Sequence, residues 1–231
     1  MSPRLATLLS LDARLQLRYG IYYAYAVVVA FYVALLVWLA PFLPPRVAGL
    51  IIFSDPAVLG FFFLGALMML EKAEAARVAL AMTPVSAADY VLSKTLTLTA
   101  IAVMAVGVIA GAAHESANWP ILIAATVLTS IQFIGIGIPI ALKFRTVTAY
   151  LIGSAALLLP VVLPAGLALL DPMPGWAIVI PAASQLRLIL IGTGVADAGA
   201  GGIAAMLAVC AIAAAVGMLA GIRSLKREFG K

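Results

Sequence analysis

The residue types that usually carry chemistry are scarce in this chain of 231 residues, and they do not form a catalytic or metal-binding set. One cysteine, Cys210, and one histidine, His114, cannot supply the several ligands of a zinc site. Ser154 follows Gly153 in an apolar run, but a serine nucleophile needs a base beside it, and the only histidine is expected near the other surface. The phosphate-binding pattern G-x-x-x-x-G-K-S/T is absent. We therefore predict no catalytic, cofactor-binding or metal-binding residues, and a chain that is not itself an ATPase.

The most informative polar residues stand together between two apolar runs, over residues 71–94. Thr83 can cap a helix that begins at Pro84, and Ser86 with Asp89 has the spacing of a capping box, in which each residue satisfies an amide of the other. These signals predict a short, capped helix outside the membrane within residues 82–94.

Two carboxylates, Glu71 and Glu74, precede this segment. If Ser54 or Asp55 caps a helix with Pro56 at its first position, Glu71 lies only about 22 Å along that helix. Both carboxylates are then expected near the inner membrane boundary or just below it. The alternative is simple pairing with the basic residues beside them, Lys72 and Arg77.

Inside the predicted spans, Gln132 is the most polar group near a centre. It either faces a substrate path or joins two helices by a hydrogen bond. The central parts of the predicted spans contain no Asp, Glu or His, the residues at which proton- and sodium-coupled carriers bind their ions. This absence argues against ion-coupled transport.

The elements that position these residues follow from the composition, with 65% hydrophobic and 10% charged residues. Soluble domains carry about 25% charged residues, and a bilayer core needs roughly 20 apolar residues per helix. The long gaps between charged residues predict an all-α integral membrane protein of one domain, 1–231, with six transmembrane helices. The expected spans are about 21–42, 56–76, 95–113, 119–142, 146–170 and 199–222.

Orientation follows from the basic residues, because cytoplasmic loops are enriched in Lys and Arg. With the N-terminus in the cytoplasm, twelve of the fourteen basic residues lie inside, which predicts a multi-pass protein of the cytoplasmic membrane with both termini in the cytoplasm. The net charge of +5 is then matched by lipid headgroups, and nucleic acid is not expected as a partner. Residues 5–20 are expected to form an amphipathic helix in the inner interface, with Leu5, Leu8, Leu9 and Leu15 near one face and Asp12 mainly elsewhere.

The longest stretch between spans, residues 171–198, contains two apolar pieces, Trp176–Ile180 and Ala182–Ile191, that are too short to cross. We expect short outer half-helices there, sheltered by protein. The rival topology makes 176–196 a seventh span, but it places Arg187 at mid-membrane and moves the basic C-terminus outside. A G-x-x-x-G pair, Gly107 and Gly111, predicts close packing on the third span, either within the chain or between subunits.

The segment after the second span resembles that of type-2 ABC exporter permeases. Acidic residues leave the second span, a Leu-rich turn and T/S-P follow, and then come a small helix, Tyr, and a Lys that opens the third span. The residues that match this pattern in register are Glu71, Glu74, Leu80, Thr83, Pro84, Ser86, Tyr90 and Lys94. The chain departs from the pattern at 75–78, with Ala-Ala where the family often has Gly-Thr and Arg-Val where it often has Leu-Glu.

The resemblance implies a non-catalytic permease subunit that pairs with a second copy or a paralogue and with cytosolic ABC ATPases, which bind the ATP and magnesium. It implies that the helix after span two docks on the ATPase, so that coupling falls to Glu71, Glu74, Thr83, Pro84, Val85, Ser86, Asp89, Tyr90 and Lys94. The size and the Arg-rich opening are most similar to fluoroquinolone-exporter permeases, which implies efflux of a hydrophobic or amphipathic small molecule. The alternative is an ATPase-independent secondary carrier or a membrane scaffold protein.

Overall fold

The structure is a computed structural model that describes residues 3–39, 42, 44–73, 85–113 and 117–229, and all regular secondary structure in these ranges is helical. The elements are α1 (Pro3–Arg18), α2 (Ile21–Leu39), α3 (Arg46–Val58), the π-helical η1 (Leu59–Phe63), α4 (Leu64–Ala73), α6 (Ala87–Ala113), α7 (Trp119–Ala141), α8 (Val147–Val162), the 3₁₀ helices η2 (Leu163–Leu169) and η3 (Gly175–Val179), α9 (Pro181–Gly192) and α10 (Ala200–Phe229).

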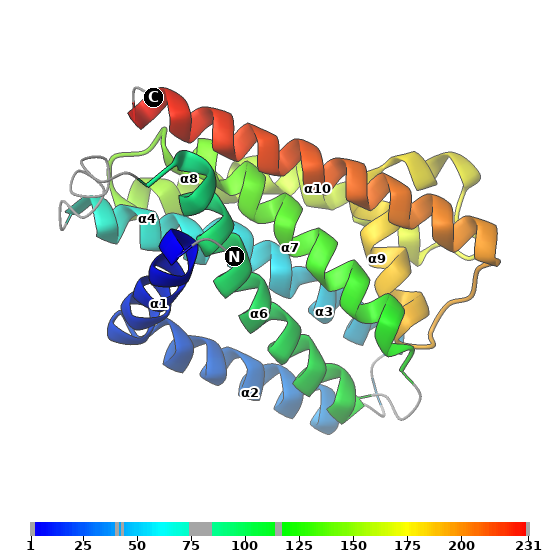
Figure 1. The fold of residues 1–231 in the computed structure, drawn as a ribbon. Coiled ribbons are helices and arrows are strands. Elements are labelled where there is room, and N and C mark those ends of the chain that lie inside the picture. The colour runs from blue at the N-terminus through cyan, green and yellow to red at the C-terminus, as the bar shows by residue number, and fades with distance from the viewer. Residues whose placement is uncertain (1–2, 40–41, 43, 74–84, 114–116, 230–231) are drawn as a thin grey trace.

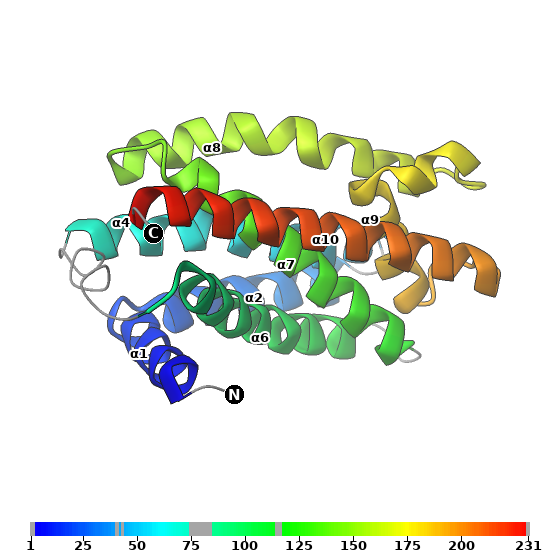
Figure 2. The ribbon, with the colours of Figure 1, turned by 45° about the horizontal axis from the view of Figure 1, so that its top comes forward.

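The long helices run alongside one another, and α1 lies across their direction (Figures 1 and 2). Within the described ranges, five helices are long and apolar enough to cross a membrane: α2, α6, α7, α8 continued by η2, and α10. An all-α membrane protein is therefore confirmed, while the count of six spans stays a prediction. We call the end where α4, α7 and α10 finish and α2, α6 and α8 begin the Lys94 end, and the opposite one the Arg187 end.

The expected second span differs from its prediction. The helix begins at Arg46 rather than at Pro56 and runs through α3, η1 and α4 to Ala73. Pro56 lies inside α3 instead of at the start of a helix, and the π turn follows it. Proline has no N–H for the helical ladder, and π turns absorb such interruptions. Asp55 is consequently not an N-cap at the membrane surface but a buried residue within the composite helix.

The segment expected as a short separate helix is also different. From Ala87 onward the chain forms one continuous helix, α6, that includes the expected third span and ends at Ala113. Ser86 precedes it and forms the predicted capping box: the Asp89 amide donates to Ser86 Oγ at 3.0 Å, and the Ser86 amide donates to Asp89 Oδ2 at 3.3 Å. A displacement at the start of α6 is therefore carried directly along its length, because no break separates the two parts.

Close approaches between helices occur at glycines around α7, which lies at the centre of the bundle. A Cβ on Gly135 would stand 2.2 Å from the backbone of Gly217 in α10, so only glycine permits this crossing. A Cβ on Gly65 in α4 would stand 1.9 Å from the ring of Tyr150 in α8. By contrast, Cβ positions at the G-x-x-x-G pair of α6 have nothing within 4 Å, so that pair does not pack against the described part of the chain.

At the Arg187 end, α9 is buried along its length from Ala182 to Gly192. Arg187 is also buried; it donates to the carbonyl oxygens of Ala168 and Leu170 and pairs with Asp171. The guanidinium thereby satisfies backbone groups where η2 ends. The seven-span topology would need one helix over 176–196, but the chain changes direction between η3 and α9.

A sharp bend joins α1 to α2. Gly20 has a φ of +71°, in the left-handed region that glycine adopts without the steric cost of a Cβ. The bend allows α1 to lie across the end of the bundle while α2 runs along it.

Candidate functional site

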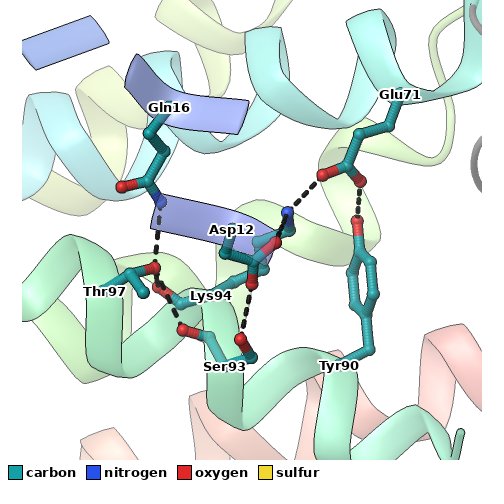
Figure 3. A network of polar contacts seen from close by, with 7 residues as sticks. All are labelled: Asp12, Gln16, Glu71, Tyr90, Ser93, Lys94 and Thr97. Atoms are coloured by element: carbon teal, nitrogen blue, oxygen red, sulfur yellow. Dashed lines mark hydrogen bonds and ion pairs between the residues drawn. The ribbon is translucent and has the colours of Figure 1, made fainter. Parts of the chain in front are cut away.

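A buried charge network joins three helices at the Lys94 end (Figure 3). Lys94, in the third turn of α6, has a fully buried side chain. Its Nζ lies 2.5 Å from Oδ1 of Asp12 in α1 and also forms an ion pair with Oε1 of Glu71 in α4. Both carboxylates are almost fully buried, with side-chain exposures of 6% and 1%. One ammonium group therefore holds α1, α4 and α6 together.

The second oxygen of each carboxylate accepts a hydrogen bond from a hydroxyl group of α6. Tyr90 donates to Oε2 of Glu71 at 2.5 Å, and Ser93 donates to Oδ2 of Asp12 at 2.5 Å. The Lys94 Nζ also lies 5.2 Å from the centroid of the Tyr90 ring, within range of a cation–π interaction. Buried charges are tolerated where their hydrogen-bonding capacity is met, and these bonds meet much of it.

A neutral contact extends the network by one turn. Gln16 Nε2 of α1 donates to Oγ1 of Thr97 at 2.9 Å, and Thr97 in turn donates to the backbone carbonyl of Ser93 at 3.0 Å. The contact gives α1 a second point of attachment to α6, about one turn further along each helix, so its orientation on α6 is fixed as well as its position.

Helical periodicity explains why these side chains meet. Tyr90, Ser93, Lys94 and Thr97 follow the i, i+3, i+4, i+7 spacing that places residues on one face of a helix. On α1, Leu5, Leu8, Asp12 and Gln16 also share a face, and all four are buried. The expectation that Asp12 lies away from the apolar face was therefore wrong, because its partners Ser93 and Lys94 compensate the buried carboxylate.

The residues expected from the sequence have three different outcomes. Glu71, Tyr90 and Lys94 come together in the network, whereas Val85, Ser86 and Asp89 lie at the start of α6, where the last two form the cap. Glu74, Thr83 and Pro84 lie outside the described residues. Glu71 is buried rather than at a headgroup surface, and its neighbour Lys72 is exposed.

Four members of the network were missed by the sequence reasoning: Asp12, Gln16, Ser93 and Thr97. A usable signal was present in α1, where Asp12 and Gln16 continue the spacing set by Leu5 and Leu8. Ser93 and Thr97 gave no signal, since serine and threonine are common in apolar helices. Their partners lie about eighty positions away in sequence.

Gln132 joins helices, as one of its two predicted roles requires. Its Oε1 accepts a hydrogen bond of 2.6 Å from Nε2 of Gln185, linking α7 to the buried α9. The side chain is 7% exposed. Its role in a substrate path stays a prediction. Ser154 Oγ lies 3.5 Å from the carbonyl oxygen of Leu151 in its own helix, and His114 is outside the described residues.

A further buried carboxyl, separate from the Lys94 network, lies within the bundle at Asp55 of α3. Tyr25 of α2 donates its hydroxyl to Oδ2 of this residue. Both side chains are buried, and the ring of Tyr25 packs edge-on against Phe63 of the π turn. If this composite helix is the second span, the expectation that the central parts of the spans contain no acidic residue does not hold for it. It depended on a second span that starts at Pro56, whereas the helix starts at Arg46 and carries Asp55 inside.

Comparison with known proteins identifies relatives. The model of the fluoroquinolones export permease protein family matches residues 3–226. Two curated relatives, both named fluoroquinolones export permease protein, come from Mycobacterium tuberculosis strains CDC 1551 / Oshkosh and ATCC 25618 / H37Rv. Each is 29% identical over 126 residues, which cover 52% of this chain and 53% of the relative, so the match spans about half the length of those proteins. No solved structure matches the chain.

Proposed function

The chain belongs to the fluoroquinolones export permease protein family, and from this premise we propose that it is the membrane-spanning, non-catalytic subunit of an ATP-driven exporter. The proposed partners are a cytosolic ABC ATPase, which binds ATP and magnesium, and a second permease copy or paralogue. The proposed cargo is a fluoroquinolone or another amphipathic small molecule, exported across the cytoplasmic membrane.

The observation that carries the proposal is the buried network around Lys94. It joins both sides of the segment proposed to contact the ATPase, because Glu71 lies near the end of α4 and Tyr90 and Lys94 lie near the start of α6. A force applied to that segment is expected to displace α4 and α6 together, because separating the buried paired charges would cost several kcal/mol of free energy. The network therefore suits a point at which force enters the membrane helices.

A path from this point into the bundle follows from the contacts. Asp12 and Gln16 tie α1 to α6, and the bend at Gly20 joins α1 to α2. Movement of α6 is then passed to α2 through α1, in addition to its passage along α6 itself. In this proposal both termini and the Lys94 end face the cytoplasm, where the ATPase resides.

Asp55 favours a second candidate function, an ion-coupled carrier that needs no ATPase. Carboxyl groups inside membrane spans are typical of proton and sodium pathways. The two candidates differ in energy source: the first requires ATP hydrolysis, and the second requires an ion gradient.

The test uses inside-out membrane vesicles containing the full chain and the cytosolic ABC ATPase proposed as its partner. We expect norfloxacin uptake that requires ATP, persists with an ionophore, and stops when the P-loop lysine of the ATPase is replaced. The variant Asp89→Lys, which adds a basic charge at the start of α6 and breaks the cap, should reduce uptake while leaving the amount of inserted protein unchanged. Uptake that does not require ATP and is abolished by the ionophore would instead establish the ion-coupled carrier.

A further inference from the structure

An apolar groove runs along the side of the bundle between α2 and α6. It has a volume of about 750 Å³. Its walls are aliphatic side chains of both helices together with three aromatic residues of α2, namely Tyr22, Tyr25 and Trp38. Apolar grooves of this size suit drug-sized molecules, and aromatic faces in such a site favour cations.

A buried carboxyl group lies next to this groove. Tyr25 is one of the lining residues, and its hydroxyl donates to Asp55, which does not itself line the groove. Asp55 is 1% exposed, and no basic side chain pairs with it in the part of the chain that the structure describes. The nearest basic residue on its own helix, Arg46, is about 14 Å along the axis and pairs with Asp171. The carboxyl group therefore has no counter-charge, and burial without one favours its neutral form over the carboxylate.

We propose that the groove between α2 and α6 binds a lipophilic cation, an apolar molecule with one positive charge, over the ring of Tyr25. A phenol that donates to a carboxylate is richer in electrons than a free one, so its ring face attracts a cation more strongly. A cation bound there favours the ionised form of Asp55, because it supplies the counter-charge that the described residues do not. The proposal rests on the proposed function in one respect: the cation is cargo of the exporter.

Charge complementarity distinguishes a lipophilic cation from two other possible occupants of an apolar groove, a lipid chain and a second subunit. A lipid chain or the apolar face of a second subunit would fill the same walls, but neither brings a positive charge to Tyr25. A matched pair of ions tests this difference, because tetraphenylphosphonium and tetraphenylborate have nearly the same shape and apolar surface and opposite charge.

The experiment measures equilibrium binding of the two ions to the purified full chain in lipid nanodiscs, without any ATPase. We expect saturable binding of tetraphenylphosphonium and none of tetraphenylborate. Asp55→Asn keeps an oxygen that can accept from Tyr25 but removes the charge, and it should weaken phosphonium binding about tenfold or more. Ala30→Trp, which fills the groove, should abolish binding, and the control Asp197→Asn, at an exposed site, should leave it unchanged.

Three results would overturn the proposal: no saturable phosphonium binding to the wild-type chain, equal binding of both ions, or unchanged binding in Asp55→Asn or Ala30→Trp. Equal binding would indicate an occupant chosen by shape alone, such as a lipid chain. Tyr25→Phe guards against misfolding, because it retains the ring and loses only the link to Asp55, so it should bind more weakly with an unchanged helical circular dichroism spectrum. Since no ATPase is present, failure here leaves the ATP-dependence test above unaffected.

Discussion

Replacing Lys94 by methionine is the sharpest test of the buried network. Methionine keeps much of the length and apolar character of the side chain but removes the ammonium group between Asp12 and Glu71. Two carboxylates then face one another in a buried site, and among the described residues each keeps only its hydroxyl partner, Ser93 or Tyr90. Removing one partner of a buried pair costs about 3–5 kcal/mol.

The free energy of unfolding can be measured by titrating the chain from mild detergent micelles into sodium dodecyl sulfate and following the helical circular dichroism signal. For Lys94→Met we expect a loss of about 3–5 kcal/mol, equivalent to a change in the unfolding equilibrium constant of roughly 10² to 10⁴. The triple variant with Asp12→Asn and Glu71→Gln removes every charge and keeps the hydroxyl bonds. It should recover most of the loss, because no unpaired charge remains.

The matched control is Lys72→Met, the same substitution at an exposed lysine next to Glu71, which should change the free energy of unfolding by less than about 0.5 kcal/mol. The stabilising role of the Lys94 charge network is refuted if Lys94→Met costs no more than this control. It is equally refuted if the triple variant is as unstable as Lys94→Met alone, because the loss would then not come from unpaired carboxylates.

Three further predictions use the same unfolding measurement. Gly65→Ala should lower the free energy of unfolding by about 1–3 kcal/mol, because its Cβ would stand 1.9 Å from a tyrosine ring. Gly107→Ala, where the space is open, should be neutral or stabilise the chain by up to about 1 kcal/mol. Equal effects of the two substitutions would contradict the packing described at Gly65. Gln185→Leu should cost about 1–3 kcal/mol by leaving Gln132 without its partner, and adding Gln132→Leu should recover part of that loss; a purely additive double variant would argue against the bond. Ser86→Ala should cost about 1 kcal/mol and speed hydrogen exchange of the backbone amide three residues later, and unchanged exchange would speak against the cap.

Local features of the fold could be predicted because their causes are adjacent in sequence. The capping box at Ser86 depends on a partner three residues away, and the short apolar pieces before α10 are recognisable from their length alone. In each case the physical reason lies within one or two helical turns.

Errors arose where distant residues change the cost of burying a polar group. Asp55 read as a cap because a carboxyl beside a proline usually starts a helix, but Tyr25 donates to it from another helix and permits its burial. Asp12 was expected mainly away from the apolar face of its helix, yet it is buried there because Lys94 and Ser93 compensate its carboxylate. The spacing of residues within one helix does not reveal which residue of another helix will be its partner.

The separation of Asp12 from Lys94 along the chain constrains the order of biosynthesis. The two residues are 82 positions apart, so the N-terminal helix is synthesised long before the lysine that binds it. Until α6 has been made and inserted, α1 has no partner for its carboxylate or for Gln16, and hydration keeps it at the membrane surface. Docking of α1 is therefore a late step of assembly, and a nascent chain that stops before residue 94 should leave α1 accessible to protease.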